Sequence, residues 1–331
     1  MSTETVDAGT SVADSAQSPL IAGEPHRQQV SPIRNRAIRW RVASPLWFLA
    51  PAGVAIAIFV IIPAVLSLVA SFFSVPLAGG SWRFVGFANF SRVAGDPIVQ
   101  KALVNTLLYC AMTIVPSLAI GLLLALVATS VSRGRPLIRT ALFLPLTANL
   151  VAMAVVFRWI FAYHGGFVNE ALGFVGITPV NWLGDTNTSL LTVALVGIWR
   201  SASFSMMIFT AGLATIPATV NEAARAEGIR GLPKLFRLTL PMMKPTVVFA
   251  SVLAILGSVQ AFDTIHVMTE GGPLYSSETV LTETYKLGFS YFDLGSASAL
   301  SFLLLVVLVG IGIAQRRVLA GSDGRSAGGT K

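Results

Sequence analysis

The feature that most constrains the fold is a series of six long apolar runs separated by polar segments. The runs cover residues 46–73, 102–130, 138–162, 190–214, 245–268 and 296–316. Each is longer than the roughly 20 residues that an α-helix needs to cross the hydrocarbon core of a bilayer. Only 11% of the residues are charged, whereas a soluble domain carries about 25%. The sequence therefore predicts an all-α membrane protein with six transmembrane helices.

The distribution of Lys and Arg predicts how these helices are oriented. Six spans place both termini on one side of the membrane, and most basic residues fall on that side, in the stretches 27–41, 133–139, 225–244 and 316–331. The opposite loops hold few, chiefly Arg83, Arg92, Lys101 and Lys286. Because cytoplasmic loops carry the excess of Lys and Arg, both termini are expected to be cytoplasmic. The net charge of +8 then reflects topology and contact with anionic lipid rather than nucleic acid.

Both ends of the chain are predicted to be polar tails. Residues 1–30 are rich in Ser, Thr, Ala, Gln and Pro and lack an apolar period, which is typical of a disordered segment, and a cluster of arginines follows, so that residues 1–42 are predicted to be a disordered cytoplasmic tail. The first run, 46–73, starts too late and is too long for the roughly 7–15-residue core of a cleaved signal peptide. It is expected to be an uncleaved span that is kinked or broken near Pro51 and Pro63. Residues 319–331 are expected to be a short cytoplasmic tail.

A polar and basic segment, Asn221–Pro245, separates the fourth run from the fifth. A helix is predicted from Ala218 to Glu227, because these residues are good helix formers. Thr215 offers a cap before it, and Pro217 suits the first turn because its missing N–H costs nothing there. Gly228 is expected to end the helix in the left-handed conformation.

A second short helix is predicted after this turn. Gly231 and Pro233 are expected to prevent simple continuation of the first helix. The second helix would run from Lys234 to Leu240 and be stopped by Pro241 and Pro245. A helix this short needs a partner to be stable, so the segment is expected to dock against another surface.

The sequence lacks the common catalytic and nucleotide-binding motifs. There is no GxxxxGK[ST] phosphate loop, no HExxH metal motif and no GxSxG nucleophile elbow. The three histidines, His26, His164 and His266, are too scattered to suggest a metal site. The single cysteine, Cys110, lies within an apolar run and is interpreted as a packing residue. The chain is therefore expected to be no enzyme and to hydrolyse no ATP itself.

Arg200 is the most conspicuous polar residue within the runs. It lies about ten residues into the fourth run, near the middle of the bilayer at about 1.5 Å per residue. A charge there is costly unless it faces a watery cavity, a group of carbonyls or a partner acid, for which Asp263 is a candidate. Two interpretations stay open: a contact that ties the helices together, or a place on a polar substrate path.

Other polar and aromatic residues in the runs are candidates for the same path. A hydroxyl-rich ligand would require amide hydrogen bonds and an aromatic face, and each of these residues also fits ordinary packing. With Phe262 as a further candidate, the set is Asn149, Trp199, Arg200, Gln260 and Asp263. Arg158, beside Trp159 and Tyr163, is interpreted as an anchor at the membrane interface.

Two of the loops on the outer side carry recognisable features. Residues 81–97 are rich in aromatic side chains and suit a helix lying at headgroup level. After the fifth run, Gly271, Gly272 and Pro273 follow one another, which predicts a tight, irregular turn.

The polar segment also contains a known signature. EAARAEG, a nine-residue gap and LTLP resemble the EAA signature of ABC-importer permeases, EAA-x3-G-x9-I-x-LP. Leu238 stands where isoleucine is usual, and Glu227 where the carbohydrate branch usually has aspartate. The residues that match the signature are Glu222, Ala223, Ala224, Gly228, Leu240 and Pro241.

The resemblance extends over residues 44–318, which are similar to the carbohydrate-uptake branch of these permeases, of the maltose-transporter large-permease type. The stretches that carry it are SPLWFLAP, FVGFANF, ALVNTL, RPLIRTALFLP, WLGDTNTS and MTEGGP, in this order. The GGP stretch favours this subunit type over its usual sister permease.

The resemblance implies a type I ABC importer permease fold. Residues 100–318 would form the five-helix core of the transmembrane domain, and the EAA segment at about 217–230 a cytoplasmic coupling helix. The implied partners are a second homologous permease, a dimeric ATPase that holds ATP and magnesium, and an extracytoplasmic solute-binding protein or lipoprotein. This chain would bind no cofactor itself and would lie in the bacterial cytoplasmic membrane.

The implied function is ATP-driven uptake of a carbohydrate, with this chain forming half of the transmembrane pathway. An alternative is a permease for another solute, such as glycerol phosphate or a glycerophosphodiester. Such an anion would require basic side chains in the path, which directs attention to Arg200 and Arg158. A membrane enzyme is a more distant alternative, because no catalytic constellation is present.

Overall fold

A computed structural model describes residues 43–75, 81–130 and 135–326, so the predicted N-terminal tail lies outside the described residues. The chain divides into two compact units, residues 1–57 and 58–331. The first contains α1 (Ala43–Ile56), with Pro51 inside it. A π-helical turn, η1 (Ala57–Ile61), then leads into α2 (Ile62–Ala70), which has Pro63 in its first turn. The helix therefore changes type just before Pro63 but continues without a break from Phe48 to Ala70.

Five helices are long and apolar enough to cross a membrane. They are Phe48–Ala70, Pro97–Ser130, Ser189–Ala214, Lys244–Met268 and Leu294–Gln315. A sixth span is formed if the bent pair Thr140–Thr147 and Leu150–Ile160, which meet at 104°, is counted as one. The prediction of six spans is confirmed on this count, but the third span is not the continuous helix expected over 138–162.

The third span breaks because the sequence starts a new helix in its middle. It consists of α5 (Arg135–Thr147) and α6 (Leu150–Ile160). The Asn149 side chain accepts hydrogen bonds from the N–H groups of Val151 at 3.0 Å and Ala152 at 3.1 Å. Asn149 is thus the N-cap of α6 and satisfies two N–H groups that would otherwise lack partners.

The fifth span is also interrupted near one end. It consists of α12 (Lys244–Val259) and α13 (Asp263–Met268), with a break over residues 260–262. The last span, α15 (Leu294–Ser326), runs well past residue 318, where a tail was expected to begin. The second span, α4 (Pro97–Ser130), begins at Pro97, five residues before the predicted apolar run of 102–130.

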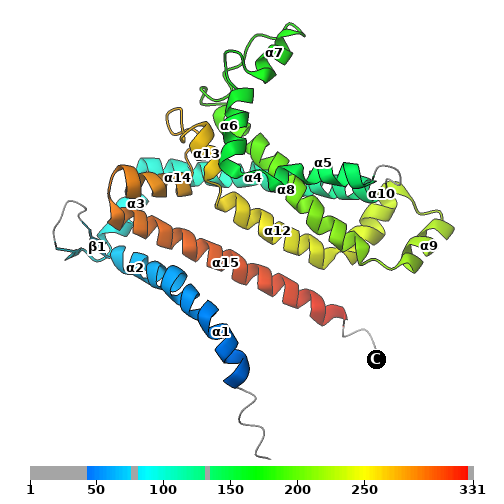
Figure 1. The fold of residues 1–331 in the computed structure, drawn as a ribbon, viewed down its shortest axis with the longest axis horizontal. Helices are drawn as coiled ribbons and strands as arrows, with labels where there is room; N and C mark the ends of the chain where they lie inside the picture. Colours follow the sequence, from blue (N-terminus) through cyan, green and yellow to red (C-terminus); the bar gives the residue numbers. More distant parts are fainter. Residues whose placement is uncertain (1–42, 76–80, 131–134, 327–331) are drawn as a thin grey trace, which may run out of the picture. The chain divides into compact units, whose positions relative to one another are not determined.

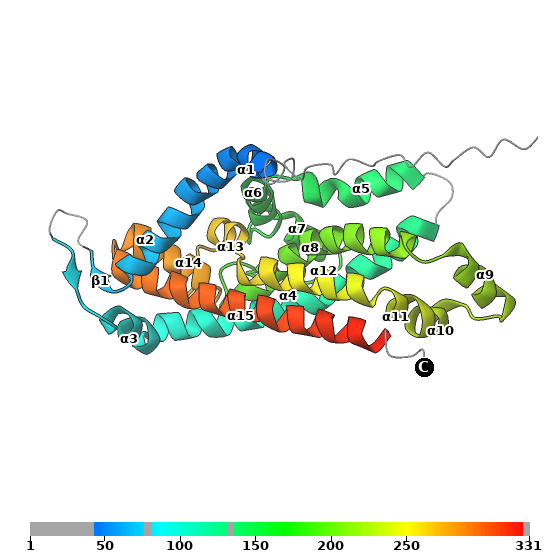
Figure 2. The ribbon, with the colours of Figure 1, turned by 90° about the horizontal axis from the view of Figure 1, so that it is seen from below.

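The pair formed by α4 and α8 (Ser189–Ala214) is the most extensive helix contact in the second unit, and α12 packs against both (Figures 1 and 2). Small residues permit the close approach. A Cβ on Gly121 would lie 2.5 Å from the Cβ of Ser205 and 2.9 Å from the Ala202 carbonyl oxygen. A Cβ on Gly197 would overlap the hydroxyl of Tyr109. Helix interfaces within membranes commonly use small residues in this way.

The ends of the spans away from residues 218–242 carry short elements. A two-stranded antiparallel ribbon joins β1 (Phe73–Ser74) to β2 (Arg83–Phe84). The helix expected within residues 81–97 is α3 (Ala88–Gly95), and α7 (Phe167–Gly173) follows the third span. Between the fifth span and α15 lie α14 (Val280–Tyr285) and the π-helical turn η3 (Lys286–Ser290).

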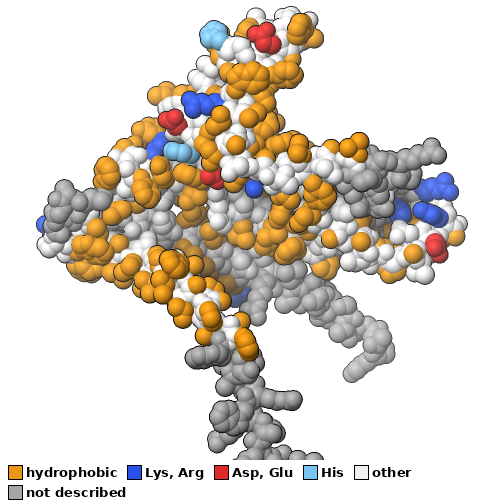
Figure 3. All heavy atoms as spheres, viewed as in Figure 1, with side chains coloured by type: hydrophobic (Ala, Val, Ile, Leu, Met, Phe, Trp, Pro, Cys, Tyr) orange, Lys and Arg blue, Asp and Glu red, His pale blue; other side chains and the backbone are white. Residues whose placement is uncertain are grey.

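Large apolar side chains are widely exposed on the long helices, as Figure 3 shows for one face. Leu107 of α4 is 63% exposed and Val115 is 68% exposed. In a soluble protein such surfaces would be costly, whereas lipid tails solvate them without penalty. The exposure therefore agrees with a membrane location.

We expect Gly121→Ala to lower thermal stability, because the added methyl group would have to displace Ser205 or the backbone of α8. Overpacking of this kind costs about 1–3 kcal/mol. Gly310→Ala is the matched control, because Gly310 lies in α15 and a Cβ there meets nothing within 4 Å. Thermal unfolding in detergent is the measurement, and equal melting temperatures of the two variants would contradict the close α4–α8 packing.

Candidate functional site

The polar segment between α8 and α12 begins with α9 (Ala218–Ala226), at the end of the second unit far from α3 and α14 (Figure 1). The predicted helix is present and begins at Ala218 as predicted, but its predicted cap was wrong. Thr215 is the C-cap of α8, and its hydroxyl donates a hydrogen bond to the Gly212 carbonyl at 2.8 Å. Pro217 is itself the N-cap of α9, because its extended backbone, with φ −57° and ψ 141°, suits that position.

Gly228 ends α9 in the predicted conformation, with φ at +72°. The N–H of Gly228 donates to the Arg225 carbonyl at 3.1 Å, and the N–H of Ile229 donates to the Ala224 carbonyl at 2.8 Å. These bonds satisfy carbonyls that the end of the helix would otherwise leave without partners. A residue with a Cβ would be strained at this φ, which explains the glycine.

The second helix of the segment differs from its prediction at both ends. It begins at Gly231, as α10 (Gly231–Lys234), and continues through the π-helical η2 (Leu235–Thr239) into α11 (Leu240–Met242). Pro233 lies within its first turn and Pro241 within the first turn of α11, so neither proline stops it. First-turn N–H groups have no partner within their own helix, and a π-helical turn precedes Pro241.

The residues of the EAA signature divide between the surface and the interior. Glu222 and Ala223 are exposed, whereas Ala224 is only 2% exposed. Leu240 is half-buried and Pro241 is exposed. Among the described residues, Glu222 forms no ion pair. The first turns of α9 therefore present a small apolar surface with a free carboxylate.

Basic side chains surround this surface. Figure 3 shows Lys and Arg side chains gathered at the end of the second unit where α9 and α10 lie. They come from the stretch 225–237, namely Arg225, Arg230, Lys234 and Arg237. This end therefore carries the positive charge that distinguishes cytoplasmic loops.

A polar cavity of about 100 Å³ lies within the helices and is lined by α4, α6, α8 and both parts of the fifth span. The two broken spans meet there: Leu150, the first residue of α6, and Gln260, at the break between α12 and α13, both line it. Irregular backbone at membrane depth is tolerated where it lines a cavity or is buried in protein. The breaks therefore place polar groups where continuous helices would place apolar ones.

Four of the six candidate path residues line this cavity: Arg200, Gln260, Phe262 and Asp263. The Nε atom of Arg200 is buried and has no hydrogen-bond partner within the described part of the chain. No ion pair between Arg200 and Asp263 is present in that part either. The contact with Asp263, which one interpretation of Arg200 required, is thus absent. The Nε–H group of the guanidinium has no hydrogen-bond acceptor among the described residues.

The other two predicted path residues serve structural roles outside the cavity lining. Asn149 caps α6, as described above. The Trp199 ring meets the Phe157 ring edge-to-face, with centroids 5.1 Å apart, and remains 41% exposed. Arg158 donates a hydrogen bond from Nη1 to the Val267 carbonyl at 3.2 Å and so joins α6 to α13.

Sequence reasoning missed two hydroxyl residues of the cavity. Tyr109 of α4 is 4% exposed and lines it beside Arg200. Ser258 lines it from α12, and its Oγ lies 2.9 Å from the Oγ1 of Thr113. Isolated hydroxyls in apolar runs gave no signal by themselves. Tyr109 occurs in α4, which packs against the helix that carries Arg200, and Ser258 lies close before Gln260.

The predicted turn at Gly271, Gly272 and Pro273 is confirmed. Gly271 has φ at +80°, and a Cβ on it would overlap the carboxylate of Glu278. The Asn105 side chain of α4 donates to the carbonyls of Tyr275 at 2.8 Å and Glu278 at 2.9 Å. The loop after the fifth span is therefore fixed to α4 and folded around a buried carboxylate.

Two carboxylates are buried beneath this loop, and their burial was not predicted. Glu278 is 0% exposed and forms an ion pair with Lys286. Glu283 is 1% exposed. Burial, with the neighbouring charge of Glu278, raises the pKa of Glu283 from 4.5 to about 7. Both glutamates lie in a polar stretch, which in sequence is indistinguishable from a solvated loop.

Comparison with known proteins identifies the family. Residues 117–320 match the family described as "Binding-protein-dependent transport system inner membrane component". The chain belongs to this family. It is 31% identical over 276 residues to the sulfoquinovosyl glycerol transport system permease protein SmoG of Agrobacterium fabrum, covering 83% of this chain and 90% of SmoG. It is 33% identical over 284 residues to the sn-glycerol-3-phosphate transport system permease protein UgpA of the same organism, covering 82% and 93%.

The fold is also found in solved structures. A chain of the bacterial alginate ABC transporter, in complex with an alginate pentasaccharide-bound periplasmic protein, superposes with a TM-score of 0.74 at 21% identity, covering 83% of this chain and 93% of that one. The predicted type I importer permease fold is confirmed. Family membership makes the chain a permease subunit of an ABC importer in the inner membrane, and not an enzyme.

We expect the pH dependence of stability to contain a contribution from Glu283. Its folded-state pKa of about 7 lies above the unfolded value of 4.5, so folding favours the protonated form. This contribution is fully present below about pH 4.5 and is lost as the pH rises through about 7. The melting temperature in detergent should therefore fall between about pH 5.5 and 8.

Glu283→Gln should remove that part of the pH dependence, because an amide does not titrate. Glu170→Gln, in the exposed first turn of α7, is the matched control and should keep the wild-type profile. Parallel profiles of wild type and Glu283→Gln would show that Glu283 titrates as a solvated carboxyl.

Proposed function

We propose that this permease carries a carbohydrate, either a mono- or an oligosaccharide, and that the cavity around Arg200 lies on its path. The observation that carries the proposal is the meeting of two broken spans at one polar cavity. In membrane transporters, discontinuous helices commonly form the substrate site near the bilayer midplane. Relatives named for lactose, in Rhizobium radiobacter, and for arabinooligosaccharides, in Bacillus subtilis, support the substrate class.

The chemistry of the lining suits a neutral, hydroxyl-rich solute. Arg200 offers an unpartnered N–H donor, Gln260 an amide, and Tyr109 and Ser258 hydroxyl groups. Asp263 lines the same cavity and formally balances the charge of Arg200. A polyol can accept from the guanidinium and donate to the carboxylate, so each charged group gains a partner.

The alternative solute is a glycerol phosphate or a glycerophosphodiester, and the likeness to UgpA favours considering it. Arg200 suits such an anion, because guanidinium groups bind phosphate well. Asp263 opposes it, because a second negative charge in a cavity of about 100 Å³ would be repelled. The carbohydrate is therefore the better match to this lining.

We expect Arg200→Ala to raise the transport KM for the sugar by about tenfold, the effect of losing about 1.4 kcal/mol of binding. The measurement is ATP-driven uptake into proteoliposomes that hold the complete transporter and its binding protein. Arg158→Ala is the matched control, because Arg158 contacts Val267 and does not line the cavity. Unchanged transport by Arg200→Ala, with a lowered melting temperature, would assign Arg200 to packing.

We further propose that α9 is the coupling helix that receives work from a partner ATPase. ATP and magnesium would be held by that ATPase, and this chain would bind no cofactor. The exposed face of Glu222 and Ala223 supports the proposal, since a small apolar surface admits close approach and a carboxylate accepts charge-assisted hydrogen bonds. A second homologous permease would form the other half of the pathway, and an extracytoplasmic binding protein would deliver the sugar.

The same proposal assigns the orientation of the chain. The basic residues over α9 and α10 support a cytoplasmic location for this end, and hence for both termini, in a bacterial cytoplasmic membrane. The loops at the other end of the spans, including the one that begins at Gly271, would then face the binding protein.

Glu222→Lys should abolish sugar uptake while leaving the amount of protein in the membrane unchanged, because the carboxylate is exposed and has no intramolecular partner to lose. Glu170→Lys, at the other end of the spans, is the charge-matched control and should retain uptake. The measurements are uptake and co-purification of the ATPase. Wild-type uptake by Glu222→Lys would exclude the coupling role.

A further inference from the structure

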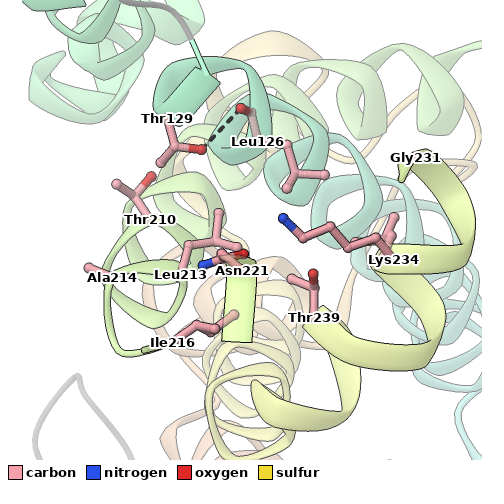
Figure 4. A pocket seen from close by; sticks show the side chains of 11 residues that line it. Leu126, Thr129, Thr210, Leu213, Ala214, Ile216, Asn221, Gly231, Lys234 and Thr239 are labelled. Carbon is pink, nitrogen blue, oxygen red and sulfur yellow. Dashed lines mark hydrogen bonds between the residues drawn. The ribbon is translucent and has the colours of Figure 1, made fainter. Parts of the chain in front are cut away.

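A second polar cavity lies at the base of the spans, where the proposed coupling segment meets them. Its volume is about 430 Å³, within the range of about 300–1,000 Å³ typical of small-molecule sites. The walls come from the C-terminal ends of α4 and α8 on one side and from α9, α10 and η2 on the other (Figure 4). It is separate from the cavity around Arg200, with which it shares no lining residue.

One side of this cavity carries polar groups that lack partners. Lys234 of α10 is half-buried and extends its ammonium group toward the space (Figure 4). Asn221, Thr210 and Thr239 also line it, and no hydrogen bond from their side chains to another described residue is present. Thr239 as a whole is only 8% exposed.

The charge of the lining has one sign. No Asp or Glu lines the cavity, so the ammonium of Lys234 has no carboxylate to balance it there. A second hollow next to it is lined by Arg225, Arg230 and again Lys234. A half-buried cation needs an anion or strong acceptors to offset its desolvation, and the surroundings increase rather than reduce the positive potential.

Apolar side chains line much of the rest of the cavity. They come from both walls: Leu126 of α4, Leu213 of α8 and Ile216 on one, and Leu235 of η2 on the other. An inorganic anion would fill only part of this volume and would leave the apolar side chains unused. The lining therefore suits an anionic group attached to a carbon body.

We propose that this cavity binds a phosphate ester, with the phosphate held by Lys234, Asn221 and Thr239 and the carbon body against the leucine side chains. Lysine binds phosphate as a point charge, and amide and hydroxyl donors complete its coordination. The phosphate belongs either to a phospholipid headgroup or to a soluble phosphorylated metabolite. The ligand touches both the spans and the coupling segment, so it resists any movement of one against the other and inhibits transport. The inhibitory role, though not the binding, rests on the proposed function.

The test is binding of glucose 6-phosphate to the complete transporter in phosphatidylcholine nanodiscs, followed by calorimetry, with glucose as the control solute. We expect saturable binding of the phosphate ester and none of glucose at this cavity. Lys234→Gln should weaken binding about tenfold or more, since it removes a charge-assisted hydrogen bond. Arg237→Gln, an equal change of charge on an exposed residue that does not line the cavity, should leave binding unchanged.

Nanodiscs that contain phosphatidylglycerol distinguish the two sources. If the headgroup is the ligand, this lipid displaces glucose 6-phosphate and raises the melting temperature of wild type but not of Lys234→Gln. Thr239→Val, which keeps the side-chain volume, is the second variant and should weaken binding of either ligand. Equal responses of Lys234→Gln and Arg237→Gln to both ligands, or no response of wild type to either, would overturn the site.

Inhibition is measured separately, as loss of sugar uptake when glucose 6-phosphate is present on the side of α9. We expect inhibition of wild type and not of Lys234→Gln. Binding without inhibition would overturn the regulatory role and keep the site. A transporter that binds the ester but imports no sugar would refute the proposed substrate and leave the site unaffected.

Discussion

The close approach of α4 and α8 is the contact on which the rest of the second unit depends. Gly121 and Gly197 allow it, because a methyl group at either position would meet atoms of the other helix. Both α12 and α5 pack against α8, so the spans on either side are positioned by this pair. Both polar cavities are lined by residues of α4 and α8, one near Tyr109 and Arg200 and the other at the ends of the two helices. A change of their separation would therefore alter both cavities together.

The positions of the spans follow from hydrophobicity, whereas the breaks within them follow from local polar chemistry. Apolar run length predicted where each span lies, because lipid requires a continuous apolar surface. The same reasoning failed at Asn149, which was considered as a ligand for a solute or as a packing residue and proved to cap a helix. A hydropathy average over many residues hides a single polar residue, but that one side chain is enough to start a new helix.

The polar segment shows a similar division between what was predictable and what was not. Gly228 was predictable because a helix end with a left-handed residue leaves few alternatives to glycine. Pro233 was judged correctly, since the first helix ends before it, but Pro241 was misjudged, since it occupies a first turn, in which a missing N–H has no consequence. Whether a proline ends a helix or begins one depends on the residues around it, and the two cases look alike in sequence.

The buried glutamates depended on long-range contacts and could not be predicted. Glu278 is far in sequence from Asn105, which fixes its backbone, and nothing in the loop itself indicates that the loop folds inward. By contrast, the place of Arg200 at a polar cavity was predictable, because a charge in a long apolar run requires a reason wherever the chain folds. Sequence reasoning succeeded where the environment was uniform lipid and failed where one segment was covered by another.

The contact between Gly271 and Glu278 makes the two positions dependent on each other. The carboxylate occupies the space into which any side chain at position 271 would project. Among related permeases, the identities of these two residues are therefore expected to vary together: a larger residue at the first position requires a shorter one at the second. An alignment should show this covariation more strongly than the conservation of either residue considered alone.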